Sequence, residues 1–326
     1  MNDNINNGNT KKMSYLDYIK AILIILILVF GLLFALTATK VVHCKTIGQF
    51  WCNVYWDLVE SPRVLIVFGG DGLGNAEKLL TILQNRDIIS LKTTTQVQNL
   101  AYVPTTSYLD KYNMVIVTQA KSMSSDQLLM FYEYAIKGNI LVWTGDAGTS
   151  SMPNDKKLSD YNIENTNVWT RVNSDEKVVP FGELISAEYI DNFCNLVNCG
   201  SINTDFVGEL LPDPDSPIAG GIKPRTSYLS GDFAIVKQIN NSSTVVDLSV
   251  DYQSNLITKS KSDTKGLGNV FPIMIRSGLG KNIVYVAVPL EYLVDVNAPD
   301  HKFDASNTGM QYPGTIRRLF LEYFGA

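Results

Sequence analysis

The longest hydrophobic pattern in the chain is a run of nineteen residues without a charge, Ala21–Thr39. At ~1.5 Å of rise per residue, a helix of that length extends ~28 Å, close to the thickness of a bilayer's hydrocarbon core. The run is apolar on every face, which is not typical of a soluble core helix. It predicts an uncleaved signal-anchor helix. A cleavable signal peptide stays open as the alternative, because Ala38 has suitable small neighbours, although its apolar region is normally shorter.

The residues around this run predict its orientation. Residues 1–20 are polar and rich in asparagine, which is typical of a disordered tail. Lys11, Lys12 and Lys20 precede the run, and only Lys40 and Lys45 follow it closely. Because lysine and arginine are retained on the cytoplasmic side, this difference favours a cytoplasmic amino terminus and an extracytoplasmic remainder.

Residues 40–62 form a separate juxtamembrane segment in which aromatic residues gather. Phe50, Trp51, Tyr55 and Trp56 lie within a few residues of the apolar run. Tryptophan and tyrosine at this distance suit a membrane-interface belt, and an amphipathic helix packed on the following domain suits the pattern equally well. Both interpretations stay open. Ser61-Pro62 then predicts a boundary, with one domain over 63–326.

Short apolar runs alternate with amphipathic segments in the first part of that domain. We expect strands at 63–68, 87–95, 113–117 and 140–143, and helices after the first and third of them. Ser124 or Ser125 is a good cap for the second helix. Strands that alternate with helices imply right-handed βαβ units. The sequence therefore predicts an α/β domain, with a mostly parallel, flavodoxin-like three-layer sheet.

The rest of the domain has a weaker pattern. Residues from about 150 to 230 are rich in Asp, Asn, Pro and Gly, and we interpret them as a long insertion over the carboxyl edge of the sheet, with a short helix near 183–197. Strand-like alternation returns at 233–239, 244–251, 270–276 and 282–288. The turn at 278–282 predicts a late β-hairpin, and an amphipathic helix is expected over 309–324.

Two small-residue turns mark the candidate site. The strand at 140–143 runs into Gly145-Asp146-Ala147-Gly148-Thr149, and the first strand runs into Gly70-Asp71-Gly72. Strand ends of this kind present ligand-binding groups at the carboxyl edge of an α/β sheet. Asp71 and Asp146 are candidates for hydrogen bonding the two turns, or for acid–base chemistry as a carboxylate pair. The glycines around Asp71 imitate a dinucleotide fingerprint, but Asn75 stands where its third glycine would be.

The order of these parts resembles the class I glutamine-amidotransferase-like superfamily, nearest to its ThuA-like and membrane-associated non-catalytic branches. Lys137–Gly148 resembles the family's G-G-x-L-V-x-x-G strand and turn, and Gly278–Tyr285 resembles its late G-x-G-x-I-V-Y segment. The resemblance implies a nucleophile at the centre of G-x-C-x-G, which is Ala147 here. A methyl group cannot attack a carbonyl, and the family's His-x-Glu also has no clear counterpart.

Composition limits the remaining functions. A net charge of −5 and a pI near 5.2 exclude nucleic-acid binding as the main role. The cysteines occur as two close pairs, Cys44 with Cys52 and Cys194 with Cys199. Disulfides are favoured over free thiols and over a metal site, and the sequence does not fix their pairing. We expect no cofactor and no metal.

The leading hypothesis is therefore a non-catalytic binding or scaffolding module at the cell envelope, with a single membrane pass and a protein or glycan partner. The alternative is an extracytoplasmic hydrolase that uses Asp71 and Asp146 on a glycan or a similar envelope substrate. Asn240 and Asn241 both stand in N-x-S sequences and are glycosylation candidates in an expected turn. They agree with the cysteines in predicting an oxidising exterior.

Overall fold

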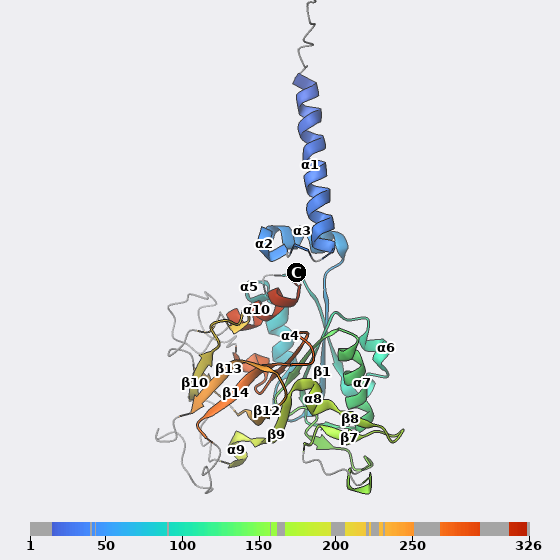
Figure 1. Cartoon of the computed structure of the whole chain (residues 1–326), viewed down its shortest axis with the longest axis vertical. Helices are drawn as coiled ribbons and strands as arrows, with labels where there is room; N and C mark the ends of the chain where they lie inside the picture. Colours follow the sequence, from blue (N-terminus) through green and yellow to red (C-terminus); the bar gives the residue numbers. More distant parts are fainter. Residues whose placement is uncertain are drawn as a thin grey trace, which may run out of the picture.

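The computed structural model describes residues 15–39, 41–42, 44–89, 91–156, 158–161, 167–196, 206–219, 222, 228–230, 232–250, 268–293 and 313–324. It places a long helix, α1 (Tyr15–Ala38), apart from a globular α/β domain (Figure 1). One window of α1, Tyr18–Ala38, is long and apolar enough to cross a membrane, and nearly all of it is exposed. This is the helix that the apolar run predicts, as a membrane anchor or a signal sequence.

The centre of the domain is a single sheet with a parallel half. Its strands are β1 (Arg63–Asp71), β2 (Thr94–Asn99), β3 (Met114–Ala120), β5 (Ile140–Thr144) and β15 (Ile283–Val286). They lie side by side in the order β2-β1-β3-β5-β15, and each neighbouring pair is parallel. This is the strand order of a flavodoxin-like sheet. The α/β class predicted from the sequence is confirmed.

The sheet continues beyond β15 in the antiparallel sense. The added strands are β10 (Phe206–Pro212), β11 (Tyr228–Ser230), β13 (Ser243–Val250) and β14 (Val270–Arg276). They extend the order as β11-β10-β13-β14-β15. The β14–β15 pair is the predicted hairpin. Part of the expected insertion, β10 and β11, therefore widens the sheet and does not cover its carboxyl edge.

Helices lie on both faces of the sheet. The main ones are α4 (Ala76–Gln84), α5 (Arg86–Ile89), α7 (Ser125–Ile136), α8 (Phe181–Ile185) and α10 (Pro313–Phe324). The crossovers β1-α4-β2 and β3-α7-β5 step in opposite directions along the sheet, so right-handed connections put α4 and α7 on opposite faces. Helices α5 and α10 pack on the α4 side, and α8 packs against α7.

Local sequence explains where the two crossover helices begin. Asn75 caps α4 by accepting a hydrogen bond from the Lys78 amide, and the apolar face of the helix is buried. Ser124 and Gln127 form a capping box at the start of α7. Beyond α7, the buried core is aromatic: the Trp143 ring contacts those of Phe131 and Phe181. These contacts fix the end of β5, which leads into the candidate site.

Smaller elements complete the described part of the chain. They are α2 (Cys44–Ile47), α3 (Gln49–Val59), α6 (Thr106–Leu109), α9 (Phe193–Leu196), β4 (Ser122–Met123), β6 (Ser150–Ser151), β7 (Thr170–Val172), β8 (Val178–Pro180), β9 (Ala187–Asn192) and β12 (Ala234–Gln238), with 3-10 turns η1 (Leu100–Tyr102), η2 (Leu158–Tyr161) and η4 (Leu290–Leu293). Strand β12 pairs with β9, which brings the insertion beside the later strands.

Two predicted elements are wrong. The second strand, expected at 87–95, begins only at Thr94, and α5 occupies most of the expected range. The helix expected near 183–197 is split in two: α8 ends at Ile185, Ser186 adopts a left-handed conformation, the chain continues as β9, and the second helix, α9, holds Cys194. Pairing with β1 and β12 overrides local propensity at these two places, because a strand's stability depends on its neighbours.

Candidate functional site

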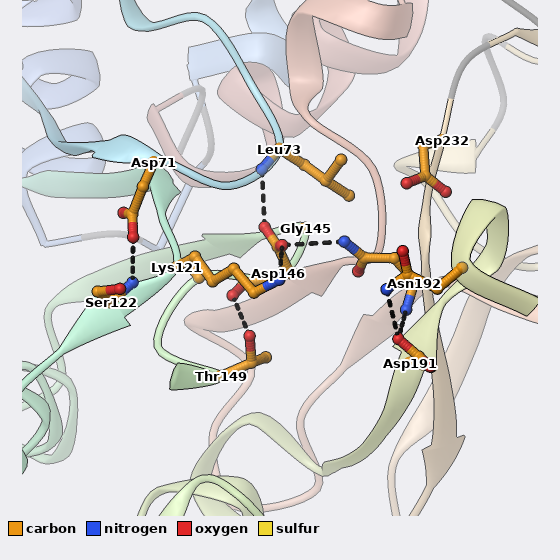
Figure 2. Close-up of polar contacts among 12 residues, drawn as sticks. Asp71, Leu73, Lys121, Ser122, Gly145, Asp146, Thr149, Asp191, Asn192 and Asp232 are labelled. Carbon is orange, nitrogen blue, oxygen red and sulfur yellow. Dashed lines mark hydrogen bonds and ion pairs between the residues drawn. The ribbon is translucent and has the colours of Figure 1, made fainter. Parts of the chain in front are cut away.

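The candidate site lies at the point where the sheet changes direction. Strand β1 is followed along the chain by β2 on one side, whereas β3 and β5 follow on the other. In such sheets, ligands bind outside the carboxyl ends of the strands at this switch point. The ends of β1, β3 and β5 place Asp71, Lys121 and Asp146 at this edge (Figure 2).

Asp146 is the central side chain of the edge, and it is only 1% exposed. Its Oδ1 accepts a hydrogen bond of 2.7 Å from the Leu73 amide, which follows β1. Its Oδ2 accepts one of 3.0 Å from the Asn192 side chain and lies 3.6 Å from the Lys121 ammonium. Because both oxygens are bound, Asp146 ties together three segments that are distant in sequence.

Asp71 has a different set of contacts. Its Oδ2 accepts a hydrogen bond of 2.9 Å from the Ser122 amide. Its Oδ1 is buried and accepts no hydrogen bond from the described part of the chain. Figure 2 shows the two carboxylates turned toward different partners, with Lys121 between them. The carboxylate pair expected for acid–base chemistry is therefore bound to separate backbone amides.

The turn after β5 is filled by side chains. Ala147 is 1% exposed, and its carbonyl accepts hydrogen bonds of 2.9 Å and 2.8 Å from the indoles of Trp143 and Trp169. The Tyr285 hydroxyl donates to the Gly145 carbonyl at 2.9 Å. A side chain that replaced the Ala147 methyl would start from a buried position. The turn resembles a nucleophile elbow in sequence, but its centre does not face solvent.

A buried arginine holds the other end of this turn. Arg171 in β7 donates to the carbonyls of Gly148, at 2.5 Å, and Met123. Its ion pair with Asp155 is 3.4 Å long. Burial lowers the pKa of Arg171 to about 10, and the Asp155 carboxylate opposes that shift. Thr149 points back to the turn, where its hydroxyl donates to the Asp146 carbonyl at 2.8 Å.

Three polar residues of the edge were missed by the sequence analysis: Asp191, Asn192 and Asp232. Asp191 accepts from the Asn192 amide at 2.8 Å and from the Asn195 side chain at 2.7 Å. Asp232 accepts from the amides of Cys194 and Phe233, both at 2.9 Å. Burial raises the pKa of the Asp232 carboxyl, and the nearby carboxylates of Asp146 and Asp191 raise it further. The edge thus carries a concentration of negative charge.

A fourth carboxylate lies deeper, beside the start of α4. Glu291 in η4 accepts a hydrogen bond from the Asn75 amide, and burial raises its pKa to about 7. Its other oxygen, like the buried Thr118 hydroxyl, has no hydrogen-bond partner in the described part of the chain. The Gly74 backbone lies close to both the Thr118 hydroxyl and the Glu291 carboxylate, because a Cβ at Gly74 would meet Thr118 Oγ1 at 2.4 Å and Glu291 Oε1 at 3.2 Å. No local pattern marks Glu291 in the sequence.

The predicted site residues therefore converge only in part. Gly145–Gly148 are buried, whereas Gly70 and Gly72 are exposed beside Asp71, and Thr149 is half-buried. Cys52 and Cys194 are disulfide-bonded, and they lie in α3 and α9, at opposite ends of the domain (Figure 1). The side chains of Cys44 and Cys199 lie outside the described residues, so the pairing stays a prediction. Asn240 and Asn241 are exposed in the turn between β12 and β13.

Metal binding finds no support in the described residues, where no group of three or more His, Cys, Asp and Glu side chains is placed to hold an ion. The polar groups described at this edge are carboxylates, the Lys121 ammonium and amides. Such a set can accept hydrogen bonds from hydroxyl and amide donors, or attract a cationic group.

No protein-family model matches the chain, and no curated protein matches it. Among solved structures it is similar to ThuA-like proteins from Bacteroides uniformis ATCC 8492 (14% identity, TM-score 0.45, 71% of this chain and 83% of that one) and Parabacteroides merdae ATCC 43184 (11%, 0.39, 70% and 79%). It is also similar to a β-galactosidase from Rahnella sp. R3 (12%, 0.42, 70%), of which it spans 28%. At these TM-scores the likenesses carry no conclusion about function.

Proposed function

We propose that this chain is a membrane-anchored, non-catalytic binding module that presents the polar edge of its sheet to a protein or glycan partner in the cell envelope. One observation carries the proposal. At the position where an attacking group would stand, the chain has the methyl group of Ala147, buried and with its carbonyl bound by two indoles. Binding needs no nucleophile, whereas acyl transfer does.

The edge beside this turn has groups that remain available to a partner. Asp191 and Asp232 are half-buried, and each uses one oxygen to accept backbone amides. Their second oxygens accept no hydrogen bond from the described part of the chain. Asp146 lies near enough to raise the pKa of Asp232, and the Lys121 ammonium pairs with Asp146. A partner rich in hydroxyl or amide donors, or one with a cationic group, is complementary to this surface.

The carboxylate-dependent hydrolase is less well supported. Its two residues, Asp71 and Asp146, are held by backbone amides of Ser122 and Leu73. A general acid or base has to reach the substrate, and the almost fully buried Asp146 has both oxygens bound. Catalysis by this pair would require that the Asn192 and Leu73 contacts break first. The same contacts explain Asp146 as a structural link.

Several observations support the location in the envelope. Helix α1 has the length and composition of an anchor, and more lysines precede it than follow it closely. The disulfide bonds at Cys52 and Cys194 suit an oxidising compartment. Both candidate glycosylation sites lie on an exposed turn, as a glycan acceptor must. We therefore place the amino terminus in the cytoplasm and the domain outside.

A binding experiment tests the functional proposal. The full chain in detergent is screened against oligosaccharides and isolated cell-wall polymers, and hits are compared between wild type, Asp232→Asn and Asp110→Asn. Asp110 is the control because it carries an exposed carboxylate, paired with Lys137, before the start of β3. We expect about tenfold weaker binding for Asp232→Asn, typical of losing one charge-assisted hydrogen bond, and no change for the control. Turnover of ester, amide or glycoside substrates that is lost in Asp146→Ala would refute the proposal.

A separate experiment tests the location. Intact cells that express the chain are treated with a membrane-impermeant protease, and the protein is alkylated with and without reductant. An extracytoplasmic domain is cleaved in intact cells and gains alkylated cysteines only after reduction. A protected domain with cysteines that react without reductant would contradict the proposed topology.

A further inference from the structure

Helix α3 crosses the end of α1 and joins the apolar helix to the domain (Figure 1). On the α1 side, Trp51 contacts the Phe30 ring at 5.2 Å, and its indole donates to the Thr37 hydroxyl at 3.0 Å. Tyr55 contacts the Phe34 ring at 5.4 Å. On the domain side, the Trp56 indole donates to the Phe324 carbonyl at 2.9 Å. α3 is thus fastened on both sides.

These contacts set the level of α3 relative to the apolar helix. Phe30 and Phe34 lie about 12 Å and about 6 Å before Ala38, the last residue of α1, at ~1.5 Å of rise per residue. If Tyr18–Ala38 crosses the bilayer, the partners of these two rings lie below the surface of the hydrocarbon region. Interfacial helices bury their apolar face about 5–10 Å into the boundary between headgroups and acyl chains. The level of α3 matches that depth.

One side of α3 carries an apolar strip whose two ends are exposed and whose middle residue is half-buried. Phe50, Val54 and Leu58 follow one another at four-residue spacing, so they form a strip along the helix. Phe50 is 81% exposed and Leu58 is 60% exposed. Trp56, which faces the domain, lies about 120–160° around the helix from the three residues of the strip, at 100° per residue. The strip therefore lies on a different side of α3 from Trp56, and Asp57, which pairs with Lys92, borders it.

We propose that α3 is an interfacial helix whose Phe50–Val54–Leu58 strip inserts into the headgroup–acyl boundary of the membrane that α1 crosses. The inference rests on the proposed anchoring of α1. The strip lies beside the side of α3 that packs, through Trp51 and Tyr55, on the apolar helix α1, which is the argument for lipid as its occupant and not a second protein. A single spanning helix leaves a domain free to tilt, and this second contact holds it in one orientation.

The orientation has a consequence for the candidate site. Strand β1 starts four residues after α3 and runs away from it, so its carboxyl end lies on the far side of the domain from α1 (Figure 1). Asp57 of α3 also pairs with Lys92 at 2.5 Å, which strengthens the connection between α3 and the sheet. The membrane contact thus presents the acidic edge away from the bilayer, where a partner can approach it.

Fluorescence quenching tests this inference on the full chain in phosphatidylcholine nanodiscs. The environment-sensitive fluorophore NBD is attached, without reductant, to Leu58→Cys, Leu28→Cys or Ile136→Cys. The three positions have similar exposure, 60%, 66% and 58%, in α3, in the middle of α1 and in α7. We expect NBD on α3 to be quenched most by lipids with a shallow nitroxide, NBD on α1 by lipids with a deep nitroxide, and NBD on α7 only by aqueous iodide. Phe50→Cys repeats the α3 measurement.

The outcomes separate this inference from the anchoring on which it rests. If NBD on α1 is quenched by lipid nitroxides but both α3 labels respond only to iodide, α3 lies in water and the inference is wrong. If neither quencher reaches the α3 labels, and this protection appears only at high protein density, a second copy of the chain covers the strip. That result would also overturn the inference. If NBD on α1 is not quenched by lipid nitroxides, the anchoring itself fails.

Discussion

Two neighbouring glycines allow the geometry of the candidate site to be tested by adding one methyl group. Gly70 and Gly72 both have positive φ values, 89° and 83°, and both are exposed. A Cβ at Gly70 would meet nothing within 4 Å. A Cβ at Gly72 would lie 2.6 Å from Asp146 Oδ1 and 2.7 Å from the Lys121 Cβ. Gly70→Ala is thus a matched control for Gly72→Ala.

The expected difference follows from what each methyl group meets. Both substitutions place a side chain at positive φ, which costs about 1–2 kcal/mol. At Gly72 the added methyl also has to displace Asp146, which is held by the Leu73 amide and by Asn192. Overpacking against atoms that cannot move costs about 1–3 kcal/mol more. We therefore expect Gly72→Ala to lower the free energy of unfolding by about 2–5 kcal/mol, and Gly70→Ala by only about 1–2 kcal/mol.

Urea unfolding of the full chain in mild detergent, followed by tryptophan fluorescence, measures both values. With a slope of about 2–3 kcal/mol per molar urea, the midpoints of the two variants should differ by roughly 0.3–1.5 M. The double variant Gly72→Ala/Asp146→Ala removes the obstructing carboxylate, so its cost should be less than the sum of the two single costs. Equal midpoints for Gly70→Ala and Gly72→Ala would refute the placement of Asp146 beside Gly72.

Three further predictions concern stability. Burial raises the pKa of Glu291 to about 7, so its contribution to stability is complete below its unfolded value near 4.5 and is lost as the pH rises through 7. Between pH 5 and pH 8, Glu291→Gln should remove up to about 3 kcal/mol of the pH dependence of the free energy of unfolding, and an unchanged pH dependence would contradict the raised pKa. Asp146→Ala leaves the buried Asn192 side chain and the half-buried Leu73 amide without an acceptor and should cost about 3–5 kcal/mol, measured by the same titration, whereas a loss below 1 kcal/mol would mean that the donors find other partners. Tyr285→Phe removes only the hydroxyl that donates to the Gly145 carbonyl, so we expect a thermal midpoint lower by a few degrees, for a loss of about 1 kcal/mol, and an unchanged midpoint would show that the bond adds nothing.

Local patterns in the sequence were sufficient to predict the long apolar helix and several strands of the central sheet. The uncharged run became α1, because length and uniform hydrophobicity are properties of a single segment. The apolar runs before Gly69 and Gly145 became β1 and β5, buried strands of a parallel sheet, and the hairpin at 278–282 formed as expected. Glycine-rich turns after buried strands also located the carboxyl edge of the sheet correctly.

The chemistry of the edge depended on tertiary structure. Asn192 reaches Asp146 only because β9 pairs with β12, and Glu291 reaches Asn75 across more than two hundred residues of chain. The orientation of the apolar strip on α3 depends on two contacts of that helix, one to α1 and one to α10, and no window of sequence contains either contact. Periodicity and propensity report the state of neighbouring residues, whereas burial, pKa and hydrogen-bond partners depend on which distant segments the fold brings together. That is why the sequence by itself determined the long apolar helix and the sheet, and only the packed structure decided which carboxylates are buried and which are partly exposed.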